Sequence, residues 1–122
     1  MSTTISGTNG VTFPDSTSMQ TGQQACKAWV NFDGTGTVAI RGAYNVSSIT
    51  DDGTGLYIVN FTNAMQDGNY SVTGCAGEDA LAGGNRMVGI RATETNYVNI
   101  RGFSAGSSAL DLPEVCVAIF SN

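Results

Sequence analysis

Residues 29–72 read WVNFDGTGTVAIRGAYNVSSITDDGTGLYIVNFTNAMQDGNYSV and decide the fold of this chain. The tetrapeptide Asp-Gly-Thr-Gly occurs twice within them, at residues 33–36 and 52–55. Each copy stands between runs of alternating apolar and polar residues, which is the pattern of half-buried β-strands. Glycine tolerates positive φ and aspartate bonds to its nearby backbone, so both copies are predicted to be strand-reversing turns. The stretch therefore predicts a meander of antiparallel strands.

The chain from residue 25 onward continues this pattern. Turn residues separate about seven predicted strands, at residues 25–32, 37–46, 56–61, 70–76, 87–93, 97–103 and 115–121. Long loops are expected at residues 76–86 and 104–114, with a weakly indicated helical turn at 78–81. No segment shows sustained helical periodicity. The predicted fold class is all-β, an antiparallel β-sandwich or jelly-roll-like domain.

Two strands carry further expectations about burial. Alternation predicts that Val38, Ile40, Tyr44 and Val46 share the core face of the second strand. The last strand, residues 115–121, is apolar on both faces. Such a strand is expected to lie in the centre of a sandwich or to be covered by another subunit.

Residues 1–24 differ from the rest of the chain, residues 25–122, which we call the head. They are polar apart from a small apolar island at Val11 and Phe13, and cannot bury enough surface to fold alone. A type I turn is expected at residues 13–16, with Pro14 in its second position. The segment is predicted to be an extended N-terminal arm, either floppy or ordered by neighbouring chains.

Composition excludes several partners. Charged residues make up only 12% of the chain, and 5 basic residues stand against 10 acidic ones. This acidic balance argues against binding nucleic acid and against docking to anionic membranes. No apolar run is long enough for a transmembrane helix, so no membrane insertion is expected. Residues 1–7 lack the features of a signal peptide, so the protein folds where it is made or is an expressed fragment.

The residues needed for common catalytic and metal sites are missing. The chain has no histidine and only 3 cysteines, Cys26, Cys75 and Cys116, which are widely spaced. Each is expected inside a strand as a buried reduced thiol, with a Cys26–Cys116 bridge as the main alternative. No serine triad, Cys-His nucleophile or usual zinc site can be built. The adjacent acids Asp51-Asp52 and Glu78-Asp79 do not converge as glycosidase carboxylates must. We therefore expect no enzyme activity, no cofactor and no metal.

Four residues are candidates for a contact surface. Arg41, Arg91 and Arg101 each follow an isoleucine, so the isoleucines should point to the core and the arginines outward. This arrangement predicts either a solvated sheet face or an arginine-lined surface for a partner. Most aromatic residues are expected in the core or at interfaces. Trp29 is the exception, because it points away from its apolar neighbours, and it is a candidate for glycan contact.

Several motifs also occur in an ordered series. They are Val-Thr-Phe-Pro-Asp at 11–15, Trp-Val-Asn-Phe at 29–32, Asn-Val-Ser-Ser-Ile at 45–49, Tyr-Ile-Val-Asn-Phe at 57–61 and Ala-Met-Gln-Asp-Gly-Asn-Tyr at 64–70. In this order they resemble the C-terminal domain of bacteriophage tail fibres, including those of marine and cyanobacterial phages. Ser16 and Gln66 depart from the Gly and Pro common in that family. The resemblance covers most of residues 10–75.

The resemblance implies a virion structural protein that assembles in the host cytoplasm. It implies a homotrimer in which the arm, with Val11 and Phe13, winds around its two neighbours as a trimerisation segment. Attachment to the host bacterial surface would follow, with other virion proteins and a host surface glycan as partners. Specificity is then expected in the loops at 76–86 and 104–114. The alternatives are a capsid decoration or head-fibre protein, and a carbohydrate-binding module.

Overall fold

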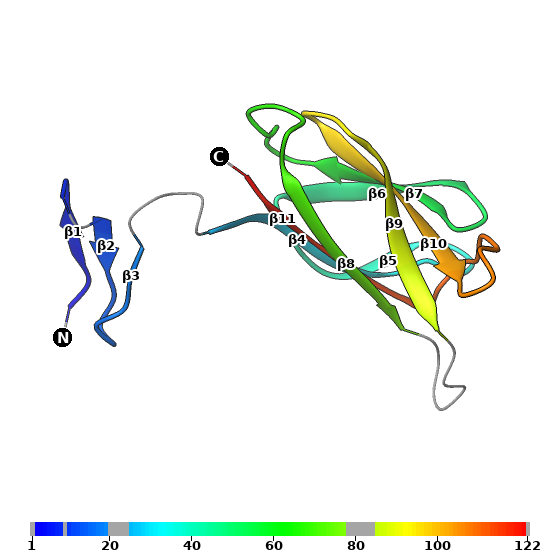
Figure 1. Ribbon diagram of the computed structural model, residues 1–122, viewed down its shortest axis with the longest axis horizontal. Helices are drawn as coiled ribbons and strands as arrows, with labels where there is room; N and C mark the ends of the chain where they lie inside the picture. The colour runs from blue at the N-terminus through cyan, green and yellow to red at the C-terminus, as the bar shows by residue number, and fades with distance from the viewer. Residues whose placement is uncertain (1, 9, 20–24, 78–84, 122) are drawn as a thin grey trace.

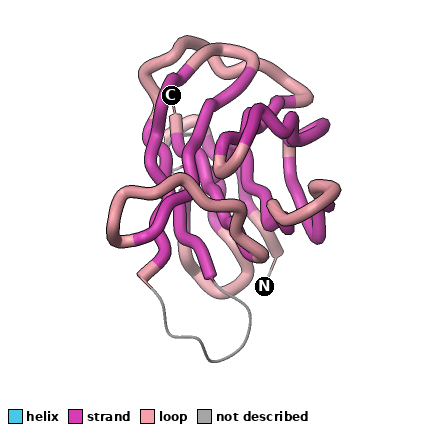
Figure 2. The backbone as a smooth tube through the Cα atoms, turned by 90° about the vertical axis from the view of Figure 1, so that its right-hand side faces the viewer, coloured by secondary structure: helices cyan, strands magenta, loops and turns pink. Residues whose placement is uncertain are grey.

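The computed structural model describes residues 2–8, 10–19, 25–77 and 85–121. These residues form eleven strands in three antiparallel sheets (Figure 1), which confirms the all-β class. Strands and loops account for all of the described backbone (Figure 2). Within those ranges there is accordingly no helix that could cross a membrane. The helical turn expected at 78–81 lies outside the described residues.

The arm carries a small sheet of its own, in the order β1-β2-β3. Its strands are β1 (Thr4–Ser6), β2 (Gly10–Thr12) and β3 (Ser18–Met19). The predicted turn at residues 13–16 is present, because the Ser16 amide donates to the Phe13 carbonyl at 3.0 Å. The Asp15 carboxylate accepts hydrogen bonds from the Thr17 hydroxyl and amide, which lower the pKa of Asp15. The arm is therefore a short folded ribbon and not simply an extended strand.

The head contains two four-stranded sheets, in the orders β5-β4-β11-β8 and β6-β7-β10-β9. Its eight strands are β4 (Cys26–Asp33), β5 (Ala39–Tyr44), β6 (Val46–Gly53), β7 (Leu56–Phe61), β8 (Ser71–Gly77), β9 (Arg86–Thr93), β10 (Tyr97–Ser104) and β11 (Glu114–Phe120). Three hairpins, β4–β5, β6–β7 and β9–β10, each stay within one sheet.

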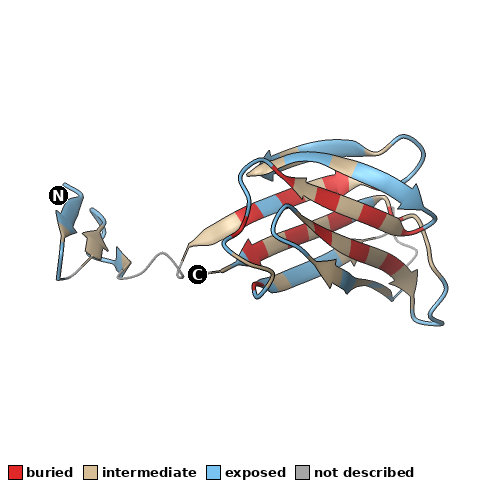
Figure 3. Cartoon of the chain, turned by 90° about the horizontal axis from the view of Figure 1, so that it is seen from above, coloured by how far each residue is buried: buried red, intermediate tan, exposed pale blue. Residues whose placement is uncertain are grey.

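Both head sheets contribute to one hydrophobic core, seen as alternating buried positions along the strands in Figure 3. Alternating residues of β4, β7, β10 and β11 are buried there: Ala28, Val30, Phe32, Tyr57, Val59, Phe61, Val98, Ile100, Val115, Val117 and Ile119. Phe32 and Tyr57 meet edge to face across the sheets, with ring centroids 5.1 Å apart. Strand β11 is central in its sheet, but only its inner face is buried, since Phe120 on its outer face is 39% exposed.

The prediction of one strand at residues 37–46 is wrong, because these residues belong to two strands in two different sheets. The chain breaks at Asn45, which has φ 55°, and passes from β5 to β6. The head therefore has eight strands where about seven were predicted. The expected core face of residues 38–46 is wrong in part, since Ile40 is 40% exposed and Tyr44 57% exposed. Strand β5 is a sheet edge, and edge positions lack the cover that alternation assumes.

The two Asp-Gly-Thr-Gly copies form the predicted turns, and one loop joins them. The Gly34 amide donates to the Leu112 carbonyl at 2.8 Å, and the Gly55 amide donates to Asp111 Oδ1 at 2.7 Å. The Tyr57 hydroxyl lies 2.9 Å from the Gly34 carbonyl oxygen and 3.1 Å from Asp111 Oδ1. Burial raises the pKa of Tyr57, so this hydroxyl stays protonated and can donate. The turns and the end of the 104–114 loop are thus one hydrogen-bonded unit.

Candidate functional site

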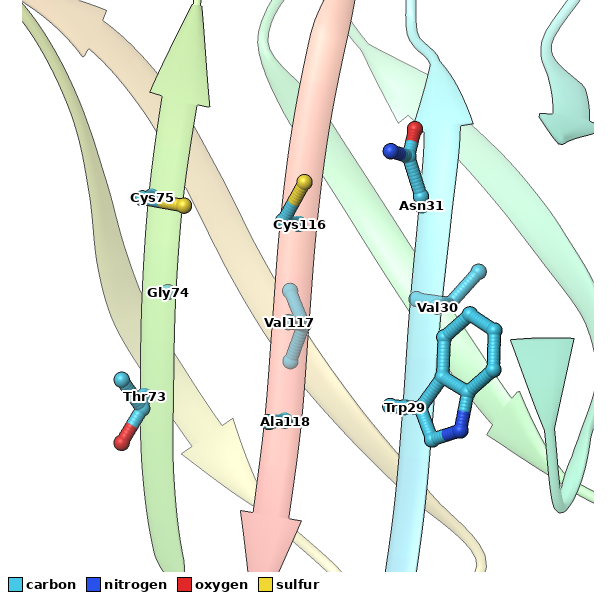
Figure 4. Close-up of a pocket in the computed structure, with 9 residues that line it drawn as sticks. All are labelled: Trp29, Val30, Asn31, Thr73, Gly74, Cys75, Cys116, Val117 and Ala118. Carbon is cyan, nitrogen blue, oxygen red and sulfur yellow. The ribbon is translucent and has the colours of Figure 1, made fainter. Parts of the chain in front are cut away.

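The outer face of the sheet β5-β4-β11-β8 carries the most distinctive surface of the head. Residues directly opposite one another on neighbouring strands share a face, and the registers give two such outward rows. The first runs Tyr44, Trp29, Ala118, Thr73, and the second runs Gly42, Asn31, Cys116, Cys75. Figure 4 shows the part of this surface on β4, β11 and β8.

Trp29 and Tyr44 form an aromatic platform at one end of the first row. Trp29 is 43% exposed, so the prediction that it points away from the core is confirmed. Its ring lies over Gly42, where an added Cβ would come within 3.3 Å of two ring carbons. Tyr44 stands opposite it on β5 and is more exposed still. The absence of a side chain at Gly42 lets the indole lie flat on the sheet.

A shallow groove of about 340 Å³ runs from this platform across β11 to β8. Its lining includes Trp29, Asn31, Thr73, Cys75, Cys116 and Ala118 (Figure 4). The groove combines the indole of Trp29 with the small side chains of β11. It therefore has the mixture of an apolar floor and a few polar groups that is typical of small-ligand sites.

Polar side chains surround Asn31, which lies on β4 two residues from Trp29. Asn31 donates to Glu114 Oε1 at 3.3 Å and accepts from the Arg41 guanidinium at 3.3 Å. Arg41 also donates to the Pro113 carbonyl at 2.6 Å and lies 3.7 Å from Asp33. The Thr35 hydroxyl and amide, and then Arg41, lower the pKa of Asp33. Arg41 is thus held inside the protein's own network.

Arg91 and Arg101 lie on the other head sheet, so the structure does not bring them together with Trp29. The Arg101 guanidinium stacks 5.6 Å from the Phe103 ring centroid and donates to the Ser107 carbonyl. Arg91 falls at the register shift of β9 against β10, where pairing steps from Ala92 to Ile90. The expectation that every preceding isoleucine is buried is wrong for Ile40 and for Ile90, which is 53% exposed, because β5 and β9 are edge strands.

The three cysteines are free thiols inside strands, as expected. The expectation of burial is wrong: Cys75 is exposed on the edge strand β8, and Cys26 and Cys116 are only partly buried. The alternative Cys26–Cys116 bridge is also wrong. Cys116 stands opposite Asn31, five residues along β4 from Cys26, which is roughly 16 Å in a strand. Cys26 instead donates its thiol hydrogen to the Ala28 carbonyl.

Cys75 and Cys116 stand directly opposite each other in β8 and β11. The sequence did not predict that these two cysteines are neighbours. Their pairing depends on the register of strands distant in the sequence. Alternation shows which face each cysteine occupies, but no local signal shows which residue of another strand it meets.

The acidic residue Asp51 stabilises a turn and, among the described residues, does not belong to a metal-binding group. Asp51 accepts a hydrogen bond from the Gly53 amide at 3.1 Å, as expected of turn chemistry. Glu78 and Asp79 lie outside the described residues. In the part of the chain that the structure describes, no three His, Cys, Asp or Glu side chains gather as a metal-binding group.

Comparison of the chain with protein-family models, with curated proteins and with solved structures gives no match.

Proposed function

We propose that this chain is a virion structural protein, a trimeric tail fibre or fibre tip that attaches a bacteriophage to its host. In this proposal the two head sheets form a β-sandwich of jelly-roll-like type that carries the exposed loops and the groove. The ordered motifs of residues 10–75 support the proposal. The observation that carries it in the structure is the small arm sheet, whose apolar face needs a cover.

The arm sheet places three apolar residues on one face. Ile5 pairs with Val11, and Val11 pairs with Met19, so their side chains project to the same side. Ile5 is 81% exposed in the single chain, and Phe13 next to the sheet is also exposed. Strands of two or three residues are shorter than the usual length of about five or six, so a sheet this small gains little stability on its own. Equivalent arms of two neighbouring copies would bury its apolar face, which is the role proposed for Val11 and Phe13.

The test of this proposal is the oligomeric state of the arm variants. Wild-type protein should have about three times the 12.6 kDa mass of one chain in native mass spectrometry and light scattering. Val11→Asp should yield monomers, because a charge cannot be buried in the apolar contact between arms. Thr12→Asp is the matched control, since Thr12 occupies the opposite face of β2, and it should remain trimeric. A monomeric wild type, or a trimer that tolerates Val11→Asp, would contradict the proposal.

The first alternative, a capsid decoration or head-fibre protein, shares this assembly and differs in where it acts. Purified protein that blocks adsorption of phage to intact host cells favours the fibre. Particles that lose stability without the protein, with adsorption unaffected, favour decoration.

The second alternative, a carbohydrate-binding module, is favoured by the aromatic platform of Trp29 and Tyr44. An exposed indole that lies flat on a sheet can stack on the apolar face of a sugar ring. Trp29→Ala should then weaken binding of a glycan by about 2 kcal/mol, roughly thirtyfold, as for a central aromatic contact. Met87→Ala is the control, because Met87 is as exposed as Trp29 but lies on the other sheet.

Glycan arrays, followed by titration calorimetry on any hit, measure this difference. Equal loss in both variants, or no loss in Trp29→Ala, would remove the platform as the binding surface. Binding by a monomer that lacks residues 1–24 would favour the module over the fibre.

A further inference from the structure

Cys75 and Cys116 form a pair of thiols on the outer face of the sheet β5-β4-β11-β8. They stand directly opposite in the antiparallel pair of β8 and β11. Opposite residues in such a pair have Cα atoms about 4.5–5.5 Å apart, and disulfides span about 4.4–6.8 Å. Both thiols lie at the same groove, and in Figure 4 the Cys75 sulfur points toward β11.

The register that brings them together is regular along the whole strand pair. Strands β8 and β11 pair without a shift from Glu114 opposite Gly77 to Phe120 opposite Ser71. The pairing of β11 with β4, by contrast, contains a register shift near its end. The two cysteines are thus held opposite each other by a continuous ladder. In Figure 4 the Cys116 sulfur does not point toward β8, so its side chain must turn for the two sulfurs to meet.

We propose that Cys75 and Cys116 are a modification site that closes to a cross-strand disulfide when it meets a small-molecule disulfide such as oxidised glutathione. The Cys75 thiolate attacks one sulfur of the oxidant and releases one glutathione thiolate. The Cys116 thiolate then attacks the Cys75 sulfur of this mixed disulfide and releases the second. Two protein thiols lose two electrons and two protons, and one oxidised glutathione becomes two reduced molecules.

The surroundings assign an order to the two cysteines. Cys75 is exposed and can be reached by the oxidant, whereas Cys116 is half-buried in the central strand. Burial, followed by the neighbouring Cys75 thiol, raises the pKa of Cys116, so less of it is thiolate at neutral pH. Cys75 is therefore the attacking thiol and Cys116 the resolving one.

The bond would tie the edge strand β8 to the central strand β11. It would close a loop of about 40 residues, for which unfolded-chain entropy predicts a substantial gain in stability, reduced by the strain of a cross-strand bridge. We expect the melting temperature to rise by about 5–10 °C. The inference is independent of the proposed virion role, since it uses only the geometry of the head.

The test is disulfide mapping of the full-length wild-type protein. Reduced protein is incubated with a glutathione redox buffer. It is then denatured in the presence of N-ethylmaleimide, which blocks the free thiols, and digested for mass spectrometry. We expect one maleimide adduct, on Cys26, and one linked peptide pair that contains Cys75 and Cys116. Three adducts, a lasting glutathione adduct on Cys75, or a bridge to Cys26 would each overturn the proposal.

Two matched variants connect the bond to stability. Cys26→Ala should keep both the linked peptide and the rise in melting temperature on oxidation. Cys75→Ala changes an exposed residue at a sheet edge, so it should fold, and it should show neither. A rise of the same size in oxidised Cys75→Ala would show that the gain has another cause.

Discussion

Gly55→Ala is expected to lower the free energy of unfolding of the head by about 3–5 kcal/mol. Gly55 has φ 68°, a conformation that side chains disfavour. An added Cβ would lie 2.5 Å from the Gly102 carbonyl oxygen and 2.6 Å from the Leu110 nitrogen. These are backbone atoms that cannot move aside without breaking the turn. The substitution would also disturb the bonds of Gly55 to Asp111 and Gly102.

The matched control is Gly36→Ala, at the same fourth position of the other Asp-Gly-Thr-Gly copy. Gly36 has a similar φ of 56°, but a Cβ there would meet nothing within 4 Å. Only the conformational cost applies, about 1 kcal/mol. Urea denaturation at one fixed protein concentration, followed by Trp29 fluorescence, measures both. Similar losses in the two variants would show that crowding around Gly55 does not matter.

The two copies also differ in crowding at their second position, where the first copy is the crowded one. A Cβ at Gly34 would overlap the Tyr57 hydroxyl, whereas one at Gly53 would come only within 3.7 Å of Leu56. Identical tetrapeptides therefore carry their constraints at different glycines. The repeat predicted both turns correctly, because turn chemistry is local. It could not predict which glycine is crowded, since the loop through Leu110 and Asp111 arrives from a distant part of the chain.

In the strands, too, the sequence predicted the features that local residues determine and missed those that depend on distant parts of the chain. Alternation in β4 predicted the buried residues Ala28, Val30 and Phe32, because the opposite face of that strand is mostly polar. In β11 both faces are apolar, so alternation alone did not show which face is buried. It misplaced Ile40 and Ile90, because alternation cannot tell an edge strand from a central one. The strand count was wrong for a related reason. Apolar residues on both sides of Asn45 continue one alternating pattern although the chain changes sheet there.

The candidate site was predictable in one part only. The outward direction of Trp29 followed from its place opposite to Val30 and Phe32 in the pattern. Its support by Gly42 and its neighbour Tyr44 depend on the register between β4 and β5, which includes a shift. The thiol pair of Cys75 and Cys116 likewise depends on register across separate strands. Such contacts are set by the packing of the whole head and leave no mark in the local sequence.

Asn45→Ala is expected to cost about 3 kcal/mol of unfolding free energy, because Asn45 holds the point where the chain crosses between sheets. Its side-chain nitrogen donates to the carbonyls of Lys27 and Asn63, at 3.0 and 3.1 Å. Its side-chain oxygen accepts from the Asn63 amide at 2.7 Å. Alanine removes all three bonds and also retains a strained positive φ.

Two further substitutions separate these causes. Asn45→Gly relieves the backbone strain but not the lost bonds, so it should cost about 1 kcal/mol less than alanine. Asn63→Ala is the matched control, because Asn63 takes part in these bonds through its backbone, and it should stay within about 0.5 kcal/mol of wild type. Urea denaturation at one fixed protein concentration measures the series. If Asn45→Ala were as stable as Asn63→Ala, the corner would be held by the sheets on either side and not by the asparagine. If glycine were worse than alanine, the positive φ would carry no cost, and the break in the strand would have to arise from the sequences that flank it.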